Sequence, residues 1–340
     1  MSWIACALAG AALVWLGGGR LESSASRLAG HYGLPEIVQG AVIVAIGSSF
    51  PELATVVVST IVHGEFELGV AAIVGSALFN ILVIPALSGL LSGRSLPTSR
   101  DLVYKEAQFY MVAVTALLLT FSFAIIYRPV TDGGPGMRGE LTRTMALLPL
   151  LVYAVYIFAQ WQDTVDHEPE DDGRTIRPGR EWARLVVGLV LIVAGVEALV
   201  RSAIGFGELL GTPSFLWGIT VVAIGTSIPD AVVSIRAARK DRPLASTANV
   251  LGSNVFDLLC CIPIGILIAG AAVVNFSVAA PLMAVLTLAT VALFVTMRTG
   301  LVITRVEAWS LLGTYVLFVA WMTAESFGVV DLIVDFPPGR

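Results

Sequence analysis

Charged side chains are scarce in this sequence of 340 residues. Asp, Glu, Lys and Arg make up 13% of it, 56% is hydrophobic, and the mean hydropathy is +0.86. A soluble domain carries about 25% charged residues, which cover its surface. The few charges present here cannot do so, and most of the chain must therefore face lipid or other buried helices. A soluble enzyme, a nucleic-acid-binding protein and a disordered scaffold are excluded.

Cysteine and histidine are also rare. Cys6, Cys260 and Cys261 all lie inside apolar runs, which excludes a disulfide framework and a spaced metal-binding knuckle. The three histidines lie in connections between apolar runs. A nucleophile with a histidine base inside a span is therefore not expected, and the sequence predicts a protein that is not an enzyme and carries no cofactor.

Ten apolar runs are each long enough to cross a bilayer, which takes about 20 residues. Because irregular backbone cannot face lipid, we expect each run to be helical. The expected spans are residues 2–19, 36–62, 67–92, 102–127 and 143–160, followed by 183–205, 213–239, 244–271, 275–297 and 303–325. No Lys or Arg precedes Arg20, so the first run is expected to be a retained helix and not a secretory signal. The prediction is an all-α membrane protein with ten transmembrane helices.

The basic residues are distributed unevenly between the two sides of this arrangement. With the N-terminus outside, five of the 20 Lys and Arg residues fall on the outer side and the remaining 15 on the cytoplasmic side. Cytoplasmic loops of membrane proteins carry such an excess of positive charge. We therefore expect a multi-pass protein of the cell membrane with both termini extracytoplasmic.

Residues 161–182 form a strongly polar stretch between the two halves. Six acidic residues lie within 163–172 and are followed by four arginines within 174–184. The acids lack the glycine and the spacing of a calcium-binding loop. A solvated cytoplasmic linker is therefore favoured over a cation-binding loop.

The two halves share two motifs at almost the same offset. AIGSSFPE (residues 45–52) matches AIGTSIPD (223–230) at an offset of 178 residues, and GSALFN (75–80) matches GSNVFD (252–257) at an offset of 177. Five helices per half is an odd number, so the second copy must enter the membrane from the opposite side. Inverted repeats are a common transporter architecture, with the substrate site near the midplane. The predicted organisation is a first repeat at 1–160 with its motif at 45–82, a linker at 161–182, and a second repeat at 183–340 with its motif at 223–259.

Three carboxylates lie well inside apolar runs, on the repeated motifs. Glu52, Asp230 and Asp257 have no Lys or Arg in their runs before the cytoplasmic ends. A charge at the membrane centre costs at least about 2.5–3.5 kcal/mol, so a bound cation is favoured as the partner. Further oxygens lie on the same helical faces, at Ser48, Ser49, Ser76, Asn80, Thr226, Ser227 and Ser253. This set of oxygens, without sulfur or imidazole, suits a hard cation such as Ca²⁺, Na⁺ or Mg²⁺.

A proline precedes the acid in each copy of the first motif. Pro51 and Pro229 each remove one helical hydrogen bond and collide with the carbonyl four residues earlier, where glycine accepts the bend. The sequence therefore predicts a break in both helices. Backbone carbonyls freed near these breaks, including those of Ala45 and Ala223, are further candidate ligands.

The paired motifs G-[ST]-S-x-P-[ED] and G-S-x-x-F-[ND] resemble the two alpha-repeats of the sodium/calcium exchangers in the cation/calcium antiporter superfamily. The resemblance covers nearly the whole chain and implies an antiporter that exchanges Ca²⁺ for Na⁺ by alternating access. It implies that Glu52 and Asp230 bind both Ca²⁺ and Na⁺. It assigns flanking Na⁺ sites to Ser49, Ser76, Thr226, Ser227, Ser253 and the carbonyls of Ala45 and Ala223, and it places Asn80 and Asp257 at the centre. Ser48 stands where threonine is more usual.

Several alternatives stay open. Asp230 and Asp257 also resemble the potassium-dependent branch, so K⁺ coupling is undecided. Proton-coupled exchangers resemble G-N-x-x-E, which the serines and prolines here disfavour, although buried carboxylates can also carry H⁺. An ion channel is disfavoured because one chain supplies both halves of the site, for which a monomer suffices. The expected partners are the transported ions and the lipid bilayer, without nucleic acid.

Overall fold

The computed structural model describes residues 2–32, 45–93, 95–131, 137–162 and 177–333. Within these ranges, nine helical segments are long and apolar enough to cross a membrane. The α-helices are α1 (Ser2–His31), α2 (Ala45–Ser48), α3 (Phe50–Ile61), α4 (Phe66–Leu82), α5 (Ile84–Leu91), α6 (Gln108–Tyr127), α7 (Arg143–Gln162), α8 (Pro178–Leu210), α9 (Ser214–Trp217), α10 (Ala223–Arg239), α11 (Pro243–Phe256), α12 (Ile262–Ala269), α13 (Phe276–Arg298) and α14 (Arg305–Ser326). The π-helices are η2 (Leu102–Ala107), η3 (Gly218–Val222) and η4 (Asp257–Cys261).

The nine segments correspond to nine of the ten expected spans. The remaining span, residues 36–62, is described only from residue 45 onward, where the short helices α2 and α3 lie. α1 and α8 are longer than predicted, because polar residues beyond the apolar runs pair between the two helices. Arg27 of α1 forms an ion pair with Glu181 of α8 at 2.8 Å. The acidic residues of the predicted linker, 163–172, lie outside the described residues.

Short strands interrupt the expected all-α architecture in the connections. β2 (Pro129–Val130), β3 (Arg138–Thr142) and β4 (Ala271–Asn275) form one antiparallel sheet, and β1 (Leu96–Pro97) pairs with β5 (Val302–Ile303). β4 fills the short break between α12 and α13. Gly270, with φ +81°, ends α12, and the Asn275 side chain caps α13 by accepting a hydrogen bond from the Ser277 N–H at 3.1 Å. The chain thus turns sharply enough for two spans to follow each other closely.

The helices that carry the repeated motifs form the centre of the molecule. In the 18-residue apolar stretch of each span, 83% of the residues are buried in Phe66–Leu91, 78% in Pro243–Ala269 and 67% in Ser214–Arg239. The corresponding share is 17% in α7 and 28% in α14. A helix surrounded by protein can carry polar groups at membrane depth, whereas an outer helix presents apolar side chains to lipid. The motifs therefore lie where buried polar groups can be accommodated.

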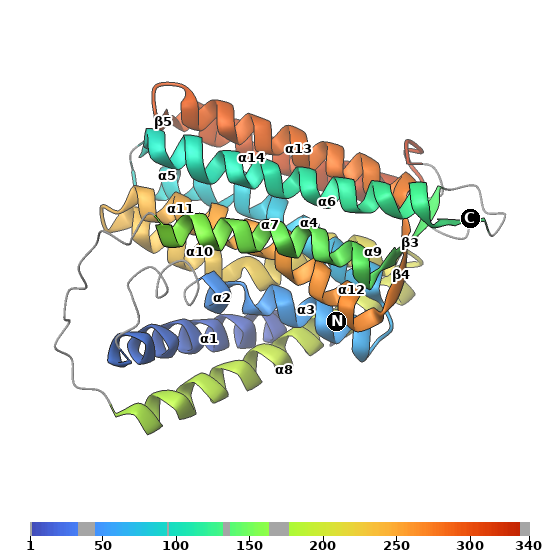
Figure 1. Ribbon diagram of the computed structural model, residues 1–340, viewed down its shortest axis with the longest axis horizontal. Coiled ribbons are helices and arrows are strands. Elements are labelled where there is room, and N and C mark those ends of the chain that lie inside the picture. The colour runs from blue at the N-terminus through green and yellow to red at the C-terminus, as the bar shows by residue number, and fades with distance from the viewer. Residues whose placement is uncertain (1, 33–44, 94, 132–136, 163–176, 334–340) are drawn as a thin grey trace.

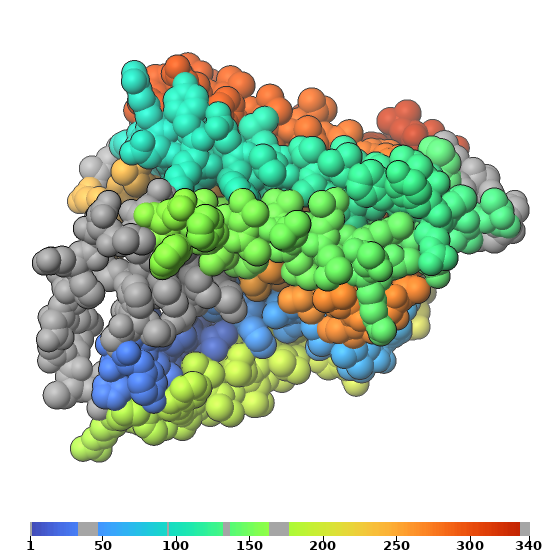
Figure 2. Space-filling model, viewed as in Figure 1, coloured from blue at the N-terminus to red at the C-terminus, as the bar shows by residue number. Residues whose placement is uncertain are grey.

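α1 and α8 lie side by side along one face of the molecule, at the lower edge of Figures 1 and 2. Glycines bring the two backbones close together. A Cβ atom at Gly10 would lie 2.7 Å from the carbonyl oxygen of Gly195, and one at Gly17 would lie 2.7 Å from that of Gly188. Small residues allow this close approach in membrane helix pairs. The offset between the repeats, 178 residues, relates Gly10 to Gly188 and Gly17 to Gly195.

We expect Gly195→Ala to destabilise the protein, although alanine is the better helix former. The new Cβ would lie 2.6 Å from the carbonyl oxygen of Gly10, and overpacking of this kind costs about 1–3 kcal/mol. The control is Gly313→Ala in α14, where no atom lies within 4 Å of the added Cβ, so that only the gain in helix propensity of about 1 kcal/mol remains. Melting temperatures of the purified variants should therefore fall for Gly195→Ala only. An equal response of both variants would contradict close α1–α8 packing.

Candidate cation-binding site

The first motif interrupts its helix at Ser49. α2 (Ala45–Ser48) ends just before it, Ser49 has φ −91° and ψ 7°, and α3 begins at Phe50. Pro51 lies in the first turn of α3, where its missing N–H disrupts no helical hydrogen bond. Glu52 follows in the same turn, and only 1% of its surface is exposed. The predicted break is present in this motif, and it sets a carboxylate at a helix N-terminus, where the helix dipole favours negative charge.

The second motif keeps its helix intact. Pro229 lies inside α10, and the irregular backbone is the π-helix η3, which directly precedes α10. The predicted break at Pro229 is therefore absent, and the backbone irregularity of this span lies upstream of the proline. The Thr226 hydroxyl donates a hydrogen bond to the Ala223 carbonyl oxygen at 3.2 Å. In this conformation the Ala223 carbonyl is thus hydrogen-bonded within its own helix.

The motif serines contact one another across the two halves of the chain. The Ser76 hydroxyl on α4 donates to Glu52 Oε1 at 3.3 Å and shares a 2.7 Å hydrogen bond with the Ser227 hydroxyl on α10. The hydroxyls of Ser48 and Ser253 lie 3.3 Å apart. All five side chains are buried. Two of these three contacts join residues from different halves, so both motifs build one cluster.

Asp230 of α10 is likewise held by side chains from both halves. Its Oδ1 accepts a hydrogen bond from the Ser253 hydroxyl of α11, and its Oδ2 accepts one from Asn80 Nδ2 of α4, each at 3.2 Å. All three side chains are fully buried. The donors are neutral, so they orient the carboxylate without compensating its charge.

Asn254 also belongs to the cluster, although it is not among the candidate ligands predicted from the sequence. Its Oδ1 accepts a hydrogen bond from Asn80 Nδ2, and its Nδ2 donates to the Ala77 carbonyl oxygen, both at 3.0 Å. Asn254 and Ala77 occupy the same position of the two repeats. The sequence signal for Asn254 is that it is a second polar residue, directly after Ser253, within an apolar span.

Asp257 begins η4 and is fully buried. Its Oδ1 accepts a weak hydrogen bond from the Cys261 thiol, with Sγ 3.8 Å from Oδ1. A thiol thus contacts one of the three carboxylates, whereas the ligand set predicted from the sequence holds oxygen atoms only. The apolar neighbourhood of Cys261 in the sequence hid the contact, which arises because one helical turn returns the chain to the face of Asp257.

Several buried oxygens of the cluster have no hydrogen-bond partner among the described residues. They are Ser49 Oγ, Glu52 Oε2, Asn80 Oδ1 and Asp257 Oδ2. Within the described ranges, no basic side chain forms a salt bridge with the three carboxylates. Burial of an uncompensated carboxylate costs several kcal/mol, which a bound cation would offset. The described chain contains no group of three or more His, Cys, Asp or Glu side chains that could hold a metal ion, so hydroxyl and amide oxygens would have to complete the coordination.

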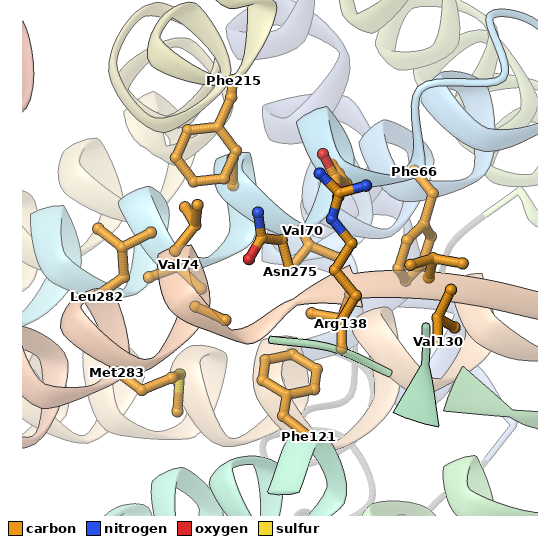
Figure 3. A pocket seen from close by; sticks show the side chains of 16 residues that line it. Phe66, Val70, Val74, Phe121, Val130, Arg138, Phe215, Asn275, Leu282 and Met283 are labelled. Atoms are coloured by element: carbon orange, nitrogen blue, oxygen red, sulfur yellow. The ribbon is translucent and has the colours of Figure 1, made fainter. Parts of the chain in front are cut away.

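A separate cavity of about 400 Å³ borders the N-terminal part of α4 (Figure 3). Apolar side chains such as Phe66, Val74 and Met283 line it, together with the polar Glu67, Arg138 and Asn275. None of the cluster side chains lines this cavity. Its mostly apolar lining does not suit a hard cation.

Comparison with known proteins agrees with this arrangement. The family profile described as sodium/calcium exchanger protein matches residues 2–162 and 181–324. Sodium/calcium exchanger MaX1 of Methanosarcina acetivorans is 27% identical over 325 residues, which cover 87% of this chain and 91% of MaX1. Human sodium/potassium/calcium exchanger 5 is 24% identical over 312 residues, which cover 67% of this chain and 62% of the human protein.

The fold also matches a solved structure. The sodium-calcium exchanger NCX_Mj, soaked with 100 mM Na⁺ and 10 mM Sr²⁺, superimposes with a TM-score of 0.63 at 22% identity, over 94% of this chain and 97% of that one. This likeness concerns the fold, whereas the family profile covers most of both halves of the sequence. The chain therefore belongs to the sodium/calcium exchanger protein family.

Proposed function

We propose that this protein is a secondary-active antiporter that exchanges Ca²⁺ for Na⁺ across the cell membrane. One observation carries the proposal: two motifs of one chain enclose three buried carboxylates, which have neutral hydrogen-bond donors but no basic partner among the described residues. Such a cluster is stable when a cation supplies the missing charge. The names of the relatives, sodium/calcium and sodium/potassium/calcium exchangers, support the same ions.

Glu52 and Asp230 are the proposed central ligands, shared by Ca²⁺ and Na⁺. Glu52 Oε2 has no protein partner among the described residues, and Asp230 is held by Ser253 and Asn80 in a fixed orientation. Asn80 and Asp257 line the centre. The proposed flanking Na⁺ ligands are Ser49, Ser76, Thr226, Ser227, Ser253 and the carbonyls of Ala45 and Ala223, and Ser48 is a further candidate cation ligand.

Alternating access fits a chain built from two inverted repeats, proposed at residues 1–160 and 183–340 and joined by a cytoplasmic linker. α1 and α8 pack on each other and reach both motifs, since α1 contacts α10 and α8 contacts α3. A Cβ at Gly18 of α1 would lie 3.0 Å from Pro229 Cγ, next to Asp230. Movement of this helix pair relative to the motif helices would change which side of the membrane reaches the cluster. Both termini are proposed to be extracytoplasmic.

Vesicles loaded with Na⁺ test the proposal directly. Purified protein in such vesicles should take up Ca²⁺ when external Na⁺ is removed, because outward Na⁺ flow drives Ca²⁺ inward. Protein-free vesicles provide the background. Uptake that ignores the Na⁺ gradient and follows a pH gradient would assign the chain to proton-coupled exchange, and conduction without counter-ion exchange would indicate a channel.

A potassium-dependent exchange is the second candidate, because Asp257 adds a third buried carboxylate and several relatives are named sodium/potassium/calcium exchangers. External K⁺ added to the same vesicles should stimulate Ca²⁺ uptake if K⁺ is carried together with Ca²⁺. In that case Asp257→Asn should abolish the stimulation, since an amide cannot offset the extra charge. Uptake that external K⁺ leaves unchanged would contradict K⁺ coupling and leave the sodium assignment intact.

A further inference from the structure

The cluster contains one soft atom, the sulfur of Cys261, which is not required to bind Ca²⁺. Cys261 is fully buried, and its Sγ lies 3.8 Å from Asp257 Oδ1. Asp257 is also fully buried, and its second oxygen, Oδ2, has no hydrogen-bond partner among the described residues. A thiol and a carboxylate with a free oxygen therefore lie side by side within the proposed cation site.

The distance between the two side chains suits a shared metal ion. Zinc binds sulfur at about 2.3 Å and carboxylate oxygen at about 2.0–2.2 Å, and with a tetrahedral angle between them the two ligand atoms lie about 3.6 Å apart. A larger ion of the same chemistry separates its ligands slightly more. The observed 3.8 Å between Sγ and Oδ1 agrees with this geometry. The two residues are four positions apart on one helix, so a single metal can bridge them without backbone movement.

We propose that Cys261 and Asp257 together bind soft divalent cations, of which cadmium is the probe, and that such ions thereby compete with Ca²⁺. This inference rests on the proposed function for its location inside the transport site. Thiolates select soft metals, whereas Ca²⁺ prefers oxygen alone. The thiolate is the ligand, so the thiol proton leaves to solvent when the metal binds. Hydroxyl oxygens of the cluster or water supply the remaining ligands, because two side chains alone do not complete a metal site.

Cys260 provides the matched control. It is the adjacent residue, it is also buried, and the described structure shows no hydrogen bond between its thiol and the cluster. Replacement of either cysteine by serine makes the same chemical change one position apart. Only Cys261→Ser removes the sulfur beside Asp257.

The test combines inhibition and metal binding. Cd²⁺ should inhibit Na⁺-driven Ca²⁺ uptake by the wild type, and its half-inhibitory concentration should rise at least about tenfold in Cys261→Ser, as expected for loss of a metal-site residue, but not in Cys260→Ser. Purified wild type titrated with Cd²⁺ alone should develop the ultraviolet charge-transfer absorbance of a metal thiolate, which Cys261→Ser lacks and which excess Ca²⁺ reduces.

Two results would overturn the inference. One is equal inhibition of the wild type and Cys261→Ser by Cd²⁺. The other is the absence of thiolate absorbance when the wild type is titrated with Cd²⁺, and this measurement does not depend on the folding of a variant. Absence of Na⁺-driven Ca²⁺ uptake by the wild type would contradict the proposed function instead. The absorbance titration requires no transport, so the two failures are distinguishable.

Discussion

Glu52→Gln is expected to reduce Na⁺-driven Ca²⁺ uptake at least about 100-fold if Glu52 is a central ligand. A loss of about 2.7 kcal/mol of binding free energy corresponds to a 100-fold loss of affinity. The glutamine has nearly the same shape and can still accept a hydrogen bond from Ser76 at the position of Oε1. At the position of Oε2, which lacks a hydrogen-bond partner among the described residues, it loses the charge that the cation needs. Initial rates of Ca²⁺ uptake into Na⁺-loaded vesicles measure the effect.

The same substitution separates binding from folding. Removal of a buried, uncompensated charge does not destabilise the fold, so the melting temperature without Na⁺ and Ca²⁺ should not fall. At 100 times its Kd, Ca²⁺ should stabilise the wild type by about 2.7 kcal/mol and so raise its melting temperature. The melting temperature of Glu52→Gln should not respond to Ca²⁺. Glu208→Gln is the control, since Glu208 is exposed at the end of α8 and should retain uptake and the calcium response. A Glu52→Gln protein that transports like the wild type would refute the assigned role.

Gly75→Ala is expected to have the second large effect. A Cβ at this position would lie 2.2 Å from the carbonyl oxygen of Ile219 and 2.8 Å from Ala223 Cβ, so α4 would have to move away from η3 and α10. The overpacking costs about 1–3 kcal/mol, more than the gain of about 1 kcal/mol in helix propensity. Because the next residue, Ser76, makes the 2.7 Å contact with Ser227, the displacement also separates the two motifs. We expect a lower melting temperature and at least about a tenfold loss of Ca²⁺ uptake.

The matched control is the equivalent glycine of the other repeat. At Gly252, an added Cβ would meet only the Tyr156 hydroxyl at 3.8 Å, an ordinary van der Waals distance. Gly252→Ala should therefore retain folding and uptake, and the melting temperature and initial uptake rate of both variants can be measured in parallel. If the two substitutions had the same effect, this result would contradict the close packing of α4 against η3 at Gly75.

The spans and the buried carboxylates were predictable because each depends on local composition. A run of apolar residues crosses the membrane whatever its neighbours are, and a charge inside such a run is costly wherever the helix packs. The ends of α1 and α8 were not predictable in this way, since Arg27 and Glu181 stabilise each other across two helices. The short strands escaped prediction for a related reason, because β3 and β4 are distant in sequence and form only by pairing.

The two repeats show most clearly which properties depend on the sequence alone and which depend on tertiary packing. The sequence by itself determined a membrane protein with two copies of an oxygen-rich motif, because hydropathy and residue spacing are properties of the chain. Only the tertiary structure decided that the helix is interrupted just ahead of Pro51 but continues through Pro229, and that Cys261 lies beside Asp257. It also decided that Gly75 is tightly enclosed while Gly252 is open. Equivalent residues differ in this way because their surroundings come from other helices, whose positions depend on the packing of the whole chain.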